Sequence, residues 1–278
     1  MRGLVRLLRP RQWVKNGFVF VPLLFTGQFT QGHAVAVTIA AAALFCLASS
    51  ATYVVNDWRD TERDRAHPVK RHARPMAAGV VTPAMALGLL VALYAILLAG
   101  AWALPRVLAV IAIYLALNLA YSFGLKHQPV IDIFVIASGF VLRVIAGAQA
   151  LAVPVSSWMF VTTLCLALYL AAVKRRQELA QAGSGAREVL DKYSLPLIDR
   201  YAEMSATGAL VFYSLFVMST HQELIVTIPV VLFGLFRYWY IVDRKGGGES
   251  PTDALLTDWQ LLLTVLAWIV LCAVRLWG

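Results

Sequence analysis

The sequence has 278 residues, of which 60% are hydrophobic and only 14% are charged, and its mean hydropathy is +0.72. A soluble chain of this length would form about two domains, but this composition excludes a water-soluble fold. Several stretches approach the ~20 consecutive apolar residues that a membrane-spanning helix needs. We therefore predict an all-α polytopic membrane protein in which residues 1–278 form a single domain.

Long apolar runs predict nine membrane-spanning helices. They cover residues 14–29, 34–56, 82–102, 105–123, 131–150, 156–176, 203–220, 223–242 and 257–276. The first run is short and contains Pro22, which a membrane helix tolerates if neighbouring groups satisfy the freed backbone. A basic start followed by an apolar run is also typical of a signal peptide. No small-residue cleavage site follows it, so we predict a first helix that is retained.

Basic residues lie mainly in alternate loops of this arrangement. They precede span one, separate spans two and three, and follow spans four, six and eight, whereas the opposite side receives Arg106 and Arg275. The positive-inside rule then places the N-terminus in the cytoplasm and the C-terminus outside. We expect the membrane to be a plasma (bacterial inner) membrane. We attribute the net charge of +9 to topology and to contact with anionic lipid, and not to nucleic-acid binding.

Four polar side chains end the second span: Asn56, Asp57, Asp60 and Asp64. If the helix continues through them, they fall within about 100° of one face, and Glu62 points away. Their oxygens suit Mg²⁺, which takes one or two carboxylates together with substrate phosphate oxygens. The competing interpretation is a cluster of solvated charges. We favour the metal site because carboxylates at the end of a membrane helix are costly unless they have a use.

A dense group of cations follows this acidic cluster, and it includes Lys70, Arg71 and Arg74. Proteins use Mg²⁺ together with Arg and Lys to hold a diphosphate and neutralise it as it leaves. Positive-inside topology explains the sign of these charges but not their position beside three aspartates, so we favour substrate binding. His67 and His72 in the same loop receive no catalytic role.

The end of span four carries Asn118, Ser122 and Lys126, which recur every four residues and share one face, with Tyr121 beside them. They line a polar cavity or serve as hydrogen-bonding groups between helices, and the sequence does not decide between these roles.

Asp132 and Arg143 of span five are spaced so that they project in nearly the same direction. An arginine this deep needs a partner. The two residues either form a buried structural ion pair or belong to a functional site.

Span six ends in Lys174, Arg175 and Arg176, which could grip an anionic substrate. A stop-transfer charge cluster explains them equally well, and Lys174 with Glu178 also has the spacing of an ordinary ion pair on one helix. The chain contains no glycine-rich phosphate loop and no Ser–His–Asp or Cys–His arrangement. Its three cysteines lie singly in apolar runs, as buried thiols do.

The pattern Asn56-Asp57-x-x-Asp60-x-x-x-Asp64, at the end of the second of nine spans, resembles the UbiA superfamily of intramembrane prenyltransferases. The resemblance covers nearly the whole chain. It implies a nine-helix bundle with a central cavity that opens to the cytoplasm and to lipid. It also implies that the four motif residues hold Mg²⁺ against a diphosphate, with Asp57, Asp60 and Asp64 as catalytic residues.

One departure narrows the resemblance. Superfamily members ordinarily carry a second aspartate-rich motif where this chain reads Lys174-Arg175-Arg176-Gln177-Glu178. One acidic and one basic cluster suit a donor with a diphosphate at one end and a phosphate at the other, such as 5-phosphoribosyl-1-diphosphate. The segments 9–16, 66–71 and 139–147 add to a similarity with the branch that transfers phosphoribose to decaprenyl phosphate.

This branch implies transfer of 5-phosphoribose to a polyprenyl (decaprenyl) phosphate, with release of pyrophosphate, for a lipid-linked arabinose precursor of the cell wall. The residues expected to bind substrate are Lys15, Lys70, Arg71, Arg74, Lys126, Arg143, Lys174, Arg175, Arg176, Glu178 and Tyr121. We also expect contact with membrane lipid and a homo-oligomer, taken as a trimer.

Two alternatives stay open. The first is a UbiA-type aromatic prenyltransferase that uses a polyprenyl diphosphate donor. The second is a transporter, which we disfavour because the polar residues collect at one face of the membrane and not at its midplane.

Overall fold

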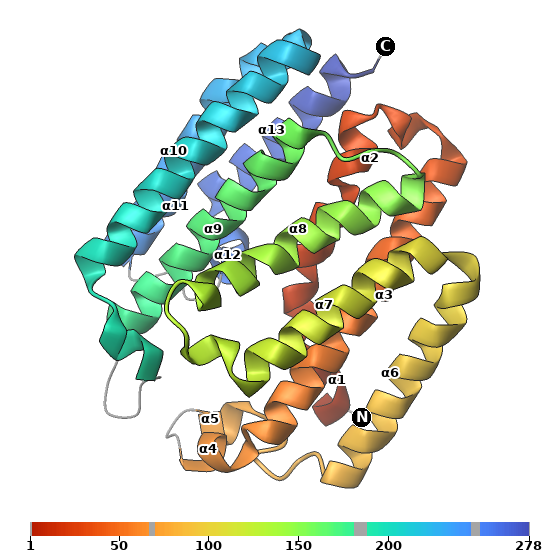
Figure 1. Ribbon diagram of the computed structural model, residues 1–278, viewed down its shortest axis with the longest axis vertical. Coiled ribbons are helices and arrows are strands. Elements are labelled where there is room, and N and C mark those ends of the chain that lie inside the picture. The colour runs from red at the N-terminus through yellow and green to blue at the C-terminus, as the bar shows by residue number, and fades with distance from the viewer. Residues whose placement is uncertain (1, 67–69, 181–187, 246–250, 278) are drawn as a thin grey trace.

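The computed structural model is a bundle of helices (Figure 1). It describes residues 2–66, 70–180, 188–245 and 251–277, and every regular element within these ranges is a helix, as predicted. The long helices are α3 (Gly32–Arg59), α6 (Pro83–Ala103), α7 (Pro105–Phe123), α8 (Ile131–Leu151), α9 (Ser157–Ala180), α10 (Leu195–Thr220), α11 (Ile228–Lys245) and α13 (Trp259–Arg275). The short α-helices are α1 (Arg2–Leu8), α2 (Val21–Phe25), α4 (Thr61–Ala66), α5 (Lys70–Ala73) and α12 (Pro251–Thr257). The 3₁₀ helices are η1 (Pro10–Phe20), η2 (Gln28–Thr30), η3 (Leu125–His127), η4 (Glu188–Lys192) and η5 (Gln222–Thr227).

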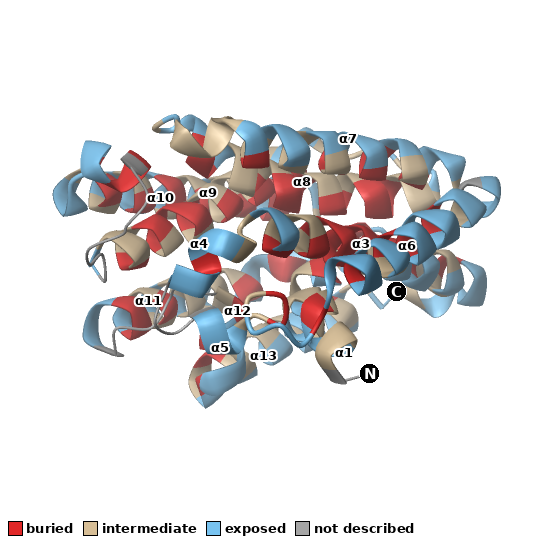
Figure 2. Cartoon of the chain, turned by 90° about the horizontal axis from the view of Figure 1, so that it is seen from below, coloured by how far each residue is buried: buried red, intermediate tan, exposed pale blue. Residues whose placement is uncertain are grey.

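Helices α3 and α8 form the centre of the bundle. More than half of the most apolar stretch of each is buried, whereas the corresponding stretches of α6, α7 and α11 are buried to less than a third. The buried face of α3 consists largely of small side chains, among them Ala41, Ala48, Ser49 and Ala51, which let neighbouring backbones approach closely. Figure 2 shows the buried residues facing one another between the helices, with exposed residues outside.

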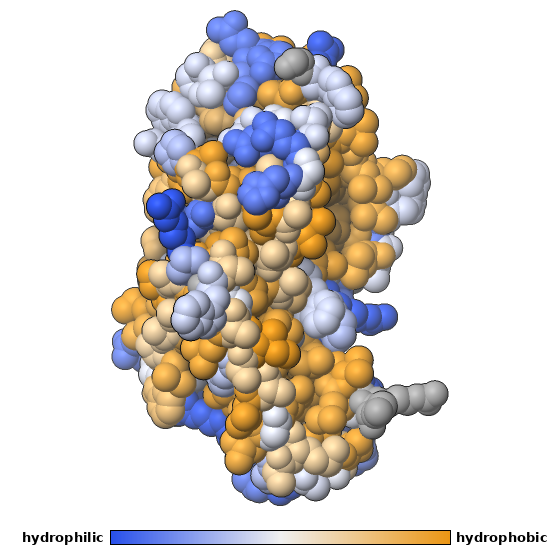
Figure 3. Space-filling model, turned by 90° about the vertical axis from the view of Figure 1, so that its right-hand side faces the viewer, coloured by the Kyte–Doolittle hydropathy of each residue, from blue (hydrophilic) through white to orange (hydrophobic). Residues whose placement is uncertain are grey.

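The outer helices expose large apolar side chains. Leu98 and Trp102 of α6, Phe123 of α7 and Phe236 of α11 are all more than half exposed. Hydrophobic residues cover much of the lateral face in Figure 3. An apolar surface of this extent belongs against lipid and not against water. Seven helices within the described residues are also long and apolar enough to cross a membrane. The chain is therefore a multi-pass membrane protein.

The membrane-spanning segments of the structure differ from the nine that the sequence predicts. Helices α12 and α13 are long enough to cross a membrane only as a pair, which bends by 95°, and the described residues contain up to eight spans if this pair is counted as one. The predicted first span, residues 14–29, is a series of short segments, because Pro22 supplies no backbone N–H and Gly27 turns the chain with a φ of 67°. Since α1 lies near one end of the bundle and α2 near the other (Figure 1), these segments still run between the two ends. The nine-helix count stays a prediction.

The segment η1 packs against α8 at a distance that requires glycine. A Cβ atom added to Gly147 would lie 2.0 Å from the carbonyl oxygen of Val19. This close approach places Lys15 and Asn16 of η1 beside the middle of α8.

The two ends of the bundle differ. The N-terminus, α4 and α5 lie at one end, and the C-terminus lies at the other (Figure 1). Helix α10 begins at Leu195, about two turns before the predicted span at residue 203. Its start is fixed by Ser194, whose hydroxyl accepts a hydrogen bond from the Leu197 N–H, and by Pro196 in the first turn.

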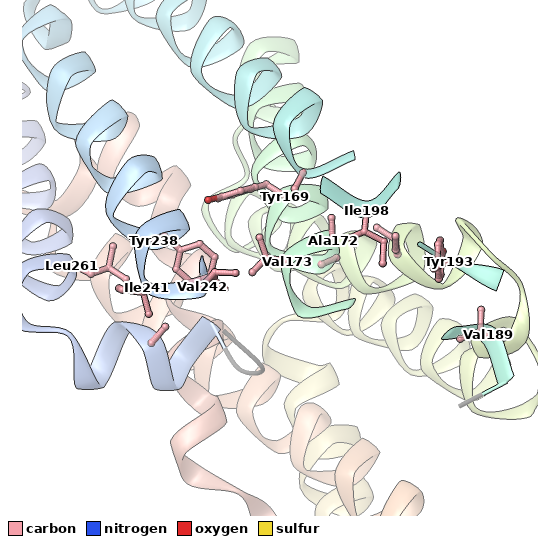
Figure 4. Close-up of a cluster of buried hydrophobic side chains, with 14 residues drawn as sticks. Tyr169, Ala172, Val173, Val189, Tyr193, Ile198, Tyr238, Ile241, Val242 and Leu261 are labelled. Atoms are coloured by element: carbon pink, nitrogen blue, oxygen red, sulfur yellow. The ribbon is translucent and has the colours of Figure 1, made fainter. Parts of the chain in front are cut away.

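A cluster of buried hydrophobic residues joins α9, α10, α11 and α13 (Figure 4). It includes Tyr169 and Val173 of α9, Ile198 of α10, Tyr238 of α11 and Leu261 of α13. Val189 and Tyr193, between α9 and α10 in sequence, pack into the same cluster. The cluster thus fixes the end of α9, where the predicted basic residues lie.

Candidate active site

The acidic cluster lies where α3 passes into α4. Helix α3 continues through Asn56 and Asp57 to Arg59, Asp60 is its C-cap, and Asp64 lies in α4. The Asp64 N–H donates to the Asp60 carbonyl oxygen at 2.8 Å, so the helical path is almost continuous.

Burial separates the acidic residues as the helical spacing predicts. Asp57 and Asp64 are buried, whereas the Glu62 side chain is 86% exposed and pairs with Arg65. Glu62 therefore points away from Asp57 and Asp64, as the helical spacing predicts.

Asp57 has two cationic partners and one oxygen without a partner. Its Oδ1 accepts hydrogen bonds from Arg9 and, at 3.0 Å, from Arg74. Its Oδ2 is buried and has no hydrogen-bond partner. A buried carboxylate oxygen in this state is costly unless something else binds it.

Helix α7 lies against the same cluster. The Ser122 hydroxyl donates to Asn56 Oδ1 at 2.6 Å, and Lys126 Nζ lies 4.0 Å from Asp60 Oδ1. Asn118 instead donates to the Tyr114 carbonyl oxygen of its own helix. Of the three residues predicted to share a face, Ser122 of α7 and Lys126 of η3 lie at the acidic residues, whereas the Asn118 amide group donates to its own helix.

The residues present fit a magnesium ion that is completed by a substrate. Within the described residues, no group of three or more His, Cys, Asp or Glu side chains is arranged to hold a metal ion alone. Mg²⁺ does not need such a group, because it keeps several waters and takes phosphate oxygens with one or two carboxylates. The unpartnered Asp57 oxygen and the neighbouring Asp60 carboxylate supply ligands of this kind.

A second group of charges surrounds Lys15 of η1. Its electrostatic neighbours include three cations, Lys174, Arg143 and Arg9, and one carboxylate, Asp253. Lys174 Nζ also lies 3.8 Å from Glu178 Oε1, so the predicted helix pair forms. Arg9 belongs both to this group and to the partners of Asp57. The group therefore connects the acidic cluster with the end of α9.

Arg143 does not pair with Asp132. Its Nε donates to Asn16 Oδ1 at 2.7 Å, and its Nη1 donates to the Gly139 carbonyl oxygen at 2.6 Å. The rings of Phe45 and Tyr114 each lie 5.1 Å from the guanidinium carbon. The interpretation as a buried ion pair within α8 is wrong, because the two side chains point the same way but lie about three turns apart along the axis.

Asp132 pairs instead with Arg175 of α9, which is fully buried. Arg175 donates to Asp132, to Glu178 and, at 2.6 Å, to the Tyr121 hydroxyl. Tyr193 donates to the other Asp132 oxygen at 2.7 Å. Burial raises the pKa of Tyr193, which keeps its hydroxyl proton available for this bond. A substrate contact through Arg175 or Tyr121 stays a prediction that this geometry does not support.

The remaining predicted cations also differ in their surroundings. Arg176 donates to Asp199 at 2.7 Å and to Asp243 at 3.5 Å, so its guanidinium group already has carboxylate partners. Arg71 is exposed and donates to His72. The side chain of Lys70 lies outside the described part of the chain.

Arg9 contacts Asp57 of the candidate site, and sequence reasoning did not select it as a site residue. The sequence gives one signal for this contact. Arg9 is among the cations that precede span one, which are predicted to lie on the same side of the membrane as the aspartates. Its backbone is in the left-handed region with a φ of 52°, and its guanidinium lies 4.7 Å from the centre of the Tyr53 ring.

The predicted central cavity remains a prediction. A groove of about 440 Å³ lies elsewhere, between α11 and α13, and is lined mainly by apolar residues such as Phe233, Trp259 and Leu263.

Known proteins are similar to this chain in sequence and in fold. The chain is 39% identical to a decaprenyl-phosphate phosphoribosyltransferase of Mycobacterium tuberculosis, over 96% of this chain and 92% of that protein. It is 38% identical to the protein of the same name from Mycolicibacterium smegmatis, over 96% and 90% of the two chains. The structure of a UbiA homolog from Archaeoglobus fulgidus bound to GPP and Mg²⁺ superposes with a TM-score of 0.76, covering 99% of both chains at 17% identity. The sequence model of the UbiA prenyltransferase family matches residues 18–257, and this chain belongs to that family.

Proposed function

We propose that this membrane protein transfers 5-phosphoribose from 5-phosphoribosyl-1-diphosphate to a polyprenyl phosphate, decaprenyl phosphate in particular, and releases pyrophosphate. The names of relatives that are 38–39% identical over 96% of the chain support this reaction. The lipid-linked product is the precursor of arabinose units in a cell wall.

One observation in the structure carries the proposal. Lys15 lies within electrostatic range of both Arg9, which contacts Asp57, and Lys174 at the end of α9. The carboxylate that we propose as a metal ligand and the group of cations are thus linked through Arg9 and Lys15. This arrangement suits a donor with a diphosphate at one end and a phosphate at the other.

The acidic residues hold the diphosphate end. Asp57, Asp60 and Asp64, with Asn56, would hold Mg²⁺, which neutralises charge on the leaving diphosphate. Ser122 fixes the Asn56 side chain by donating to its amide oxygen. Lys126, beside Asp60, places a further positive charge where a diphosphate would lie.

Lys15 and Lys174 hold the other phosphate. Both lysines have flexible stems and cationic neighbours, so an anion between them relieves their mutual repulsion. Arg143 adds its positive charge to this group from a fixed position, because neutral groups and aromatic rings hold its guanidinium in place.

The reaction is a substitution at the anomeric carbon. The bond from this carbon to the diphosphate oxygen breaks, and an oxygen of the lipid phosphate forms the new bond. Pyrophosphate leaves with the bonding electron pair. The protein's contribution is to position the two anions and to stabilise the charge that builds on the pyrophosphate.

The site faces the cytoplasm in this proposal. The N-terminus lies at the same end of the bundle as α4 and α5, and the loops that carry most basic residues join this end. The positive-inside rule then orients the protein in the bacterial inner membrane.

A donor comparison tests the proposed function. Purified protein in detergent with Mg²⁺ and decaprenyl phosphate is incubated with 5-phosphoribosyl-1-diphosphate labelled in the ribose. We expect the label in the lipid fraction, with one pyrophosphate released per transfer. Transfer from a labelled polyprenyl diphosphate to an aromatic acceptor, with no transfer of ribose, would establish the alternative donor class and overturn the proposal.

A further inference from the structure

The partners of Asp57 form a charge arrangement that neither the sequence motif nor the proposed reaction explains. One carboxylate oxygen receives two guanidinium groups, and the other oxygen receives nothing. The side chain of Asp57 is 4% exposed, whereas those of Arg9 and Arg74 are 25% and 29% exposed. The carboxylate is therefore fixed inside the protein, while both arginines extend from it towards the surface.

Two arginines on one carboxylate oppose the binding of a lone cation. A divalent ion at the free Asp57 oxygen would lie close to both guanidinium groups, and like charges at such distances repel strongly when they are partly buried. The ion would also weaken the attraction that holds each arginine. Metal binding without a counter-anion therefore has to displace these contacts or tolerate the repulsion.

A diphosphate removes this conflict. It offers several oxygens that accept paired hydrogen bonds from guanidinium groups. Arg9 has a second surface to rest on, because the Tyr53 ring lies 4.7 Å from its guanidinium carbon. Both arginine side chains are partly exposed, which leaves their guanidinium groups accessible to a diphosphate.

We propose that Arg9 and Arg74 are exchangeable partners of Asp57, which they leave for the diphosphate when a divalent metal and a diphosphate bind together. The proposal rests on the magnesium–diphosphate role of this site. Its consequence is a thermodynamic coupling, in which each of the two ligands binds weakly alone and each raises the affinity for the other by the same factor. The arginines then prevent the metal from occupying the carboxylates before the donor arrives.

The test uses Mn²⁺ and inorganic pyrophosphate with the full-length protein in detergent. Protein-bound Mn²⁺ is measured by electron paramagnetic resonance, with and without pyrophosphate, and the complex of the two ligands in solution is measured in parallel without protein. We expect pyrophosphate to tighten Mn²⁺ binding by at least about tenfold, a coupling of about 1.4 kcal/mol. Equal Mn²⁺ affinity with and without pyrophosphate would overturn the proposal.

Variants identify the residues responsible. In Arg74→Gln and in Arg9→Gln, Mn²⁺ alone should bind several-fold more tightly, pyrophosphate more weakly, and the coupling factor should fall. Arg65→Gln is the matched control, because Arg65 is a nearby exposed arginine that pairs with Glu62, and it should retain the wild-type coupling. Wild-type coupling in both arginine variants would contradict the exchange.

The two proposals fail separately. Inorganic pyrophosphate has no sugar, so the coupling is expected for any diphosphate donor. Coupling without ribose transfer would leave the exchange intact and refute the phosphoribosyl donor. Ribose transfer without coupling would refute the exchange alone.

Discussion

Two polar clusters, at the ends of α3 and α9, differ in how many of their buried polar atoms have hydrogen-bond partners. Arg175 has three acceptors, both oxygens of its partner Asp132 are used, and its side chain is fully buried. Asp57 shares one oxygen between two partly exposed arginines and leaves the other oxygen without a partner.

This difference supports our proposal that the cluster at the end of α9 is structural and that the cluster at the end of α3 is the substrate site. A buried charge whose guanidinium nitrogens each have a partner inside the protein holds helices in place and is less available to a ligand. A buried carboxylate with an unmet oxygen and removable partners is ready to bind something. In the sequence the two clusters look alike, since both are charged residues at the end of an apolar run.

Removing the buried arginine should have the largest effect. Arg175→Met would leave Asp132 as a fully buried carboxylate without its cation, at a cost of about 3–5 kcal/mol. We expect a large fall in the thermal unfolding temperature in detergent, and loss of activity as a result. Arg65→Gln, in an exposed pair, should leave the unfolding temperature unchanged. An inactive Arg175→Met protein with wild-type stability would instead place Arg175 in the substrate site.

Removing a proposed metal ligand should lower turnover without lowering stability, whereas removing Arg175 lowers stability first. Asp60→Ala should reduce turnover by a factor on the order of 10²–10³, because the metal contributes several kcal/mol of charge stabilisation. The unfolding temperature should stay close to that of the wild type, since Asp60 is partly exposed and its contact with Lys126 is 4.0 Å long. Initial rates and thermal unfolding of the same preparation check both statements. Near-normal turnover would remove Asp60 from the metal site.

A smaller effect is expected at the end of α9 that faces Lys15. Lys174→Gln should raise the KM for 5-phosphoribosyl-1-diphosphate roughly tenfold with little change in kcat, because a contact of a lysine with a phosphate is worth about 1.5 kcal/mol. Lys192→Gln, at an exposed lysine of η4, is the control. A KM unchanged by Lys174→Gln would limit the site to the acidic cluster and its arginines.

The smallest effect is expected at the acidic residue outside the cluster. Glu62→Gln should change neither turnover nor stability by more than about 0.5 kcal/mol, because its side chain is exposed and paired only at the surface. Strong inactivation by this change would show that the helical register assigned to the acidic residues is wrong.

The sequence was sufficient for features that depend on local spacing. Apolar run length located the long helices, and the helical repeat separated Glu62 from Asp57 and Asp64. It failed where partners come from distant parts of the chain. Arg9 contacts an aspartate 48 residues away, and Arg175 contacts one 43 residues away on another helix. No periodicity within one helix reveals such pairs.

The first predicted span shows a second limit. Its composition is that of a membrane segment, but Pro22 and Gly27 divide it into short helices. Its position depends on the approach of Val19 to Gly147, which only the packed structure reveals.

The most direct measurement asks whether the acidic cluster brings a metal and the donor together. Phosphorus-31 electron–nuclear double resonance on the protein with Mn²⁺ and 5-phosphoribosyl-1-diphosphate reports phosphates bound to the metal. We predict strong phosphorus coupling for the wild type and its loss in Asp60→Ala, with Arg175 and its partners intact in both proteins. A coupling that persists unchanged in Asp60→Ala, or no protein-bound Mn²⁺ with phosphorus coupling in the wild type, would contradict the account.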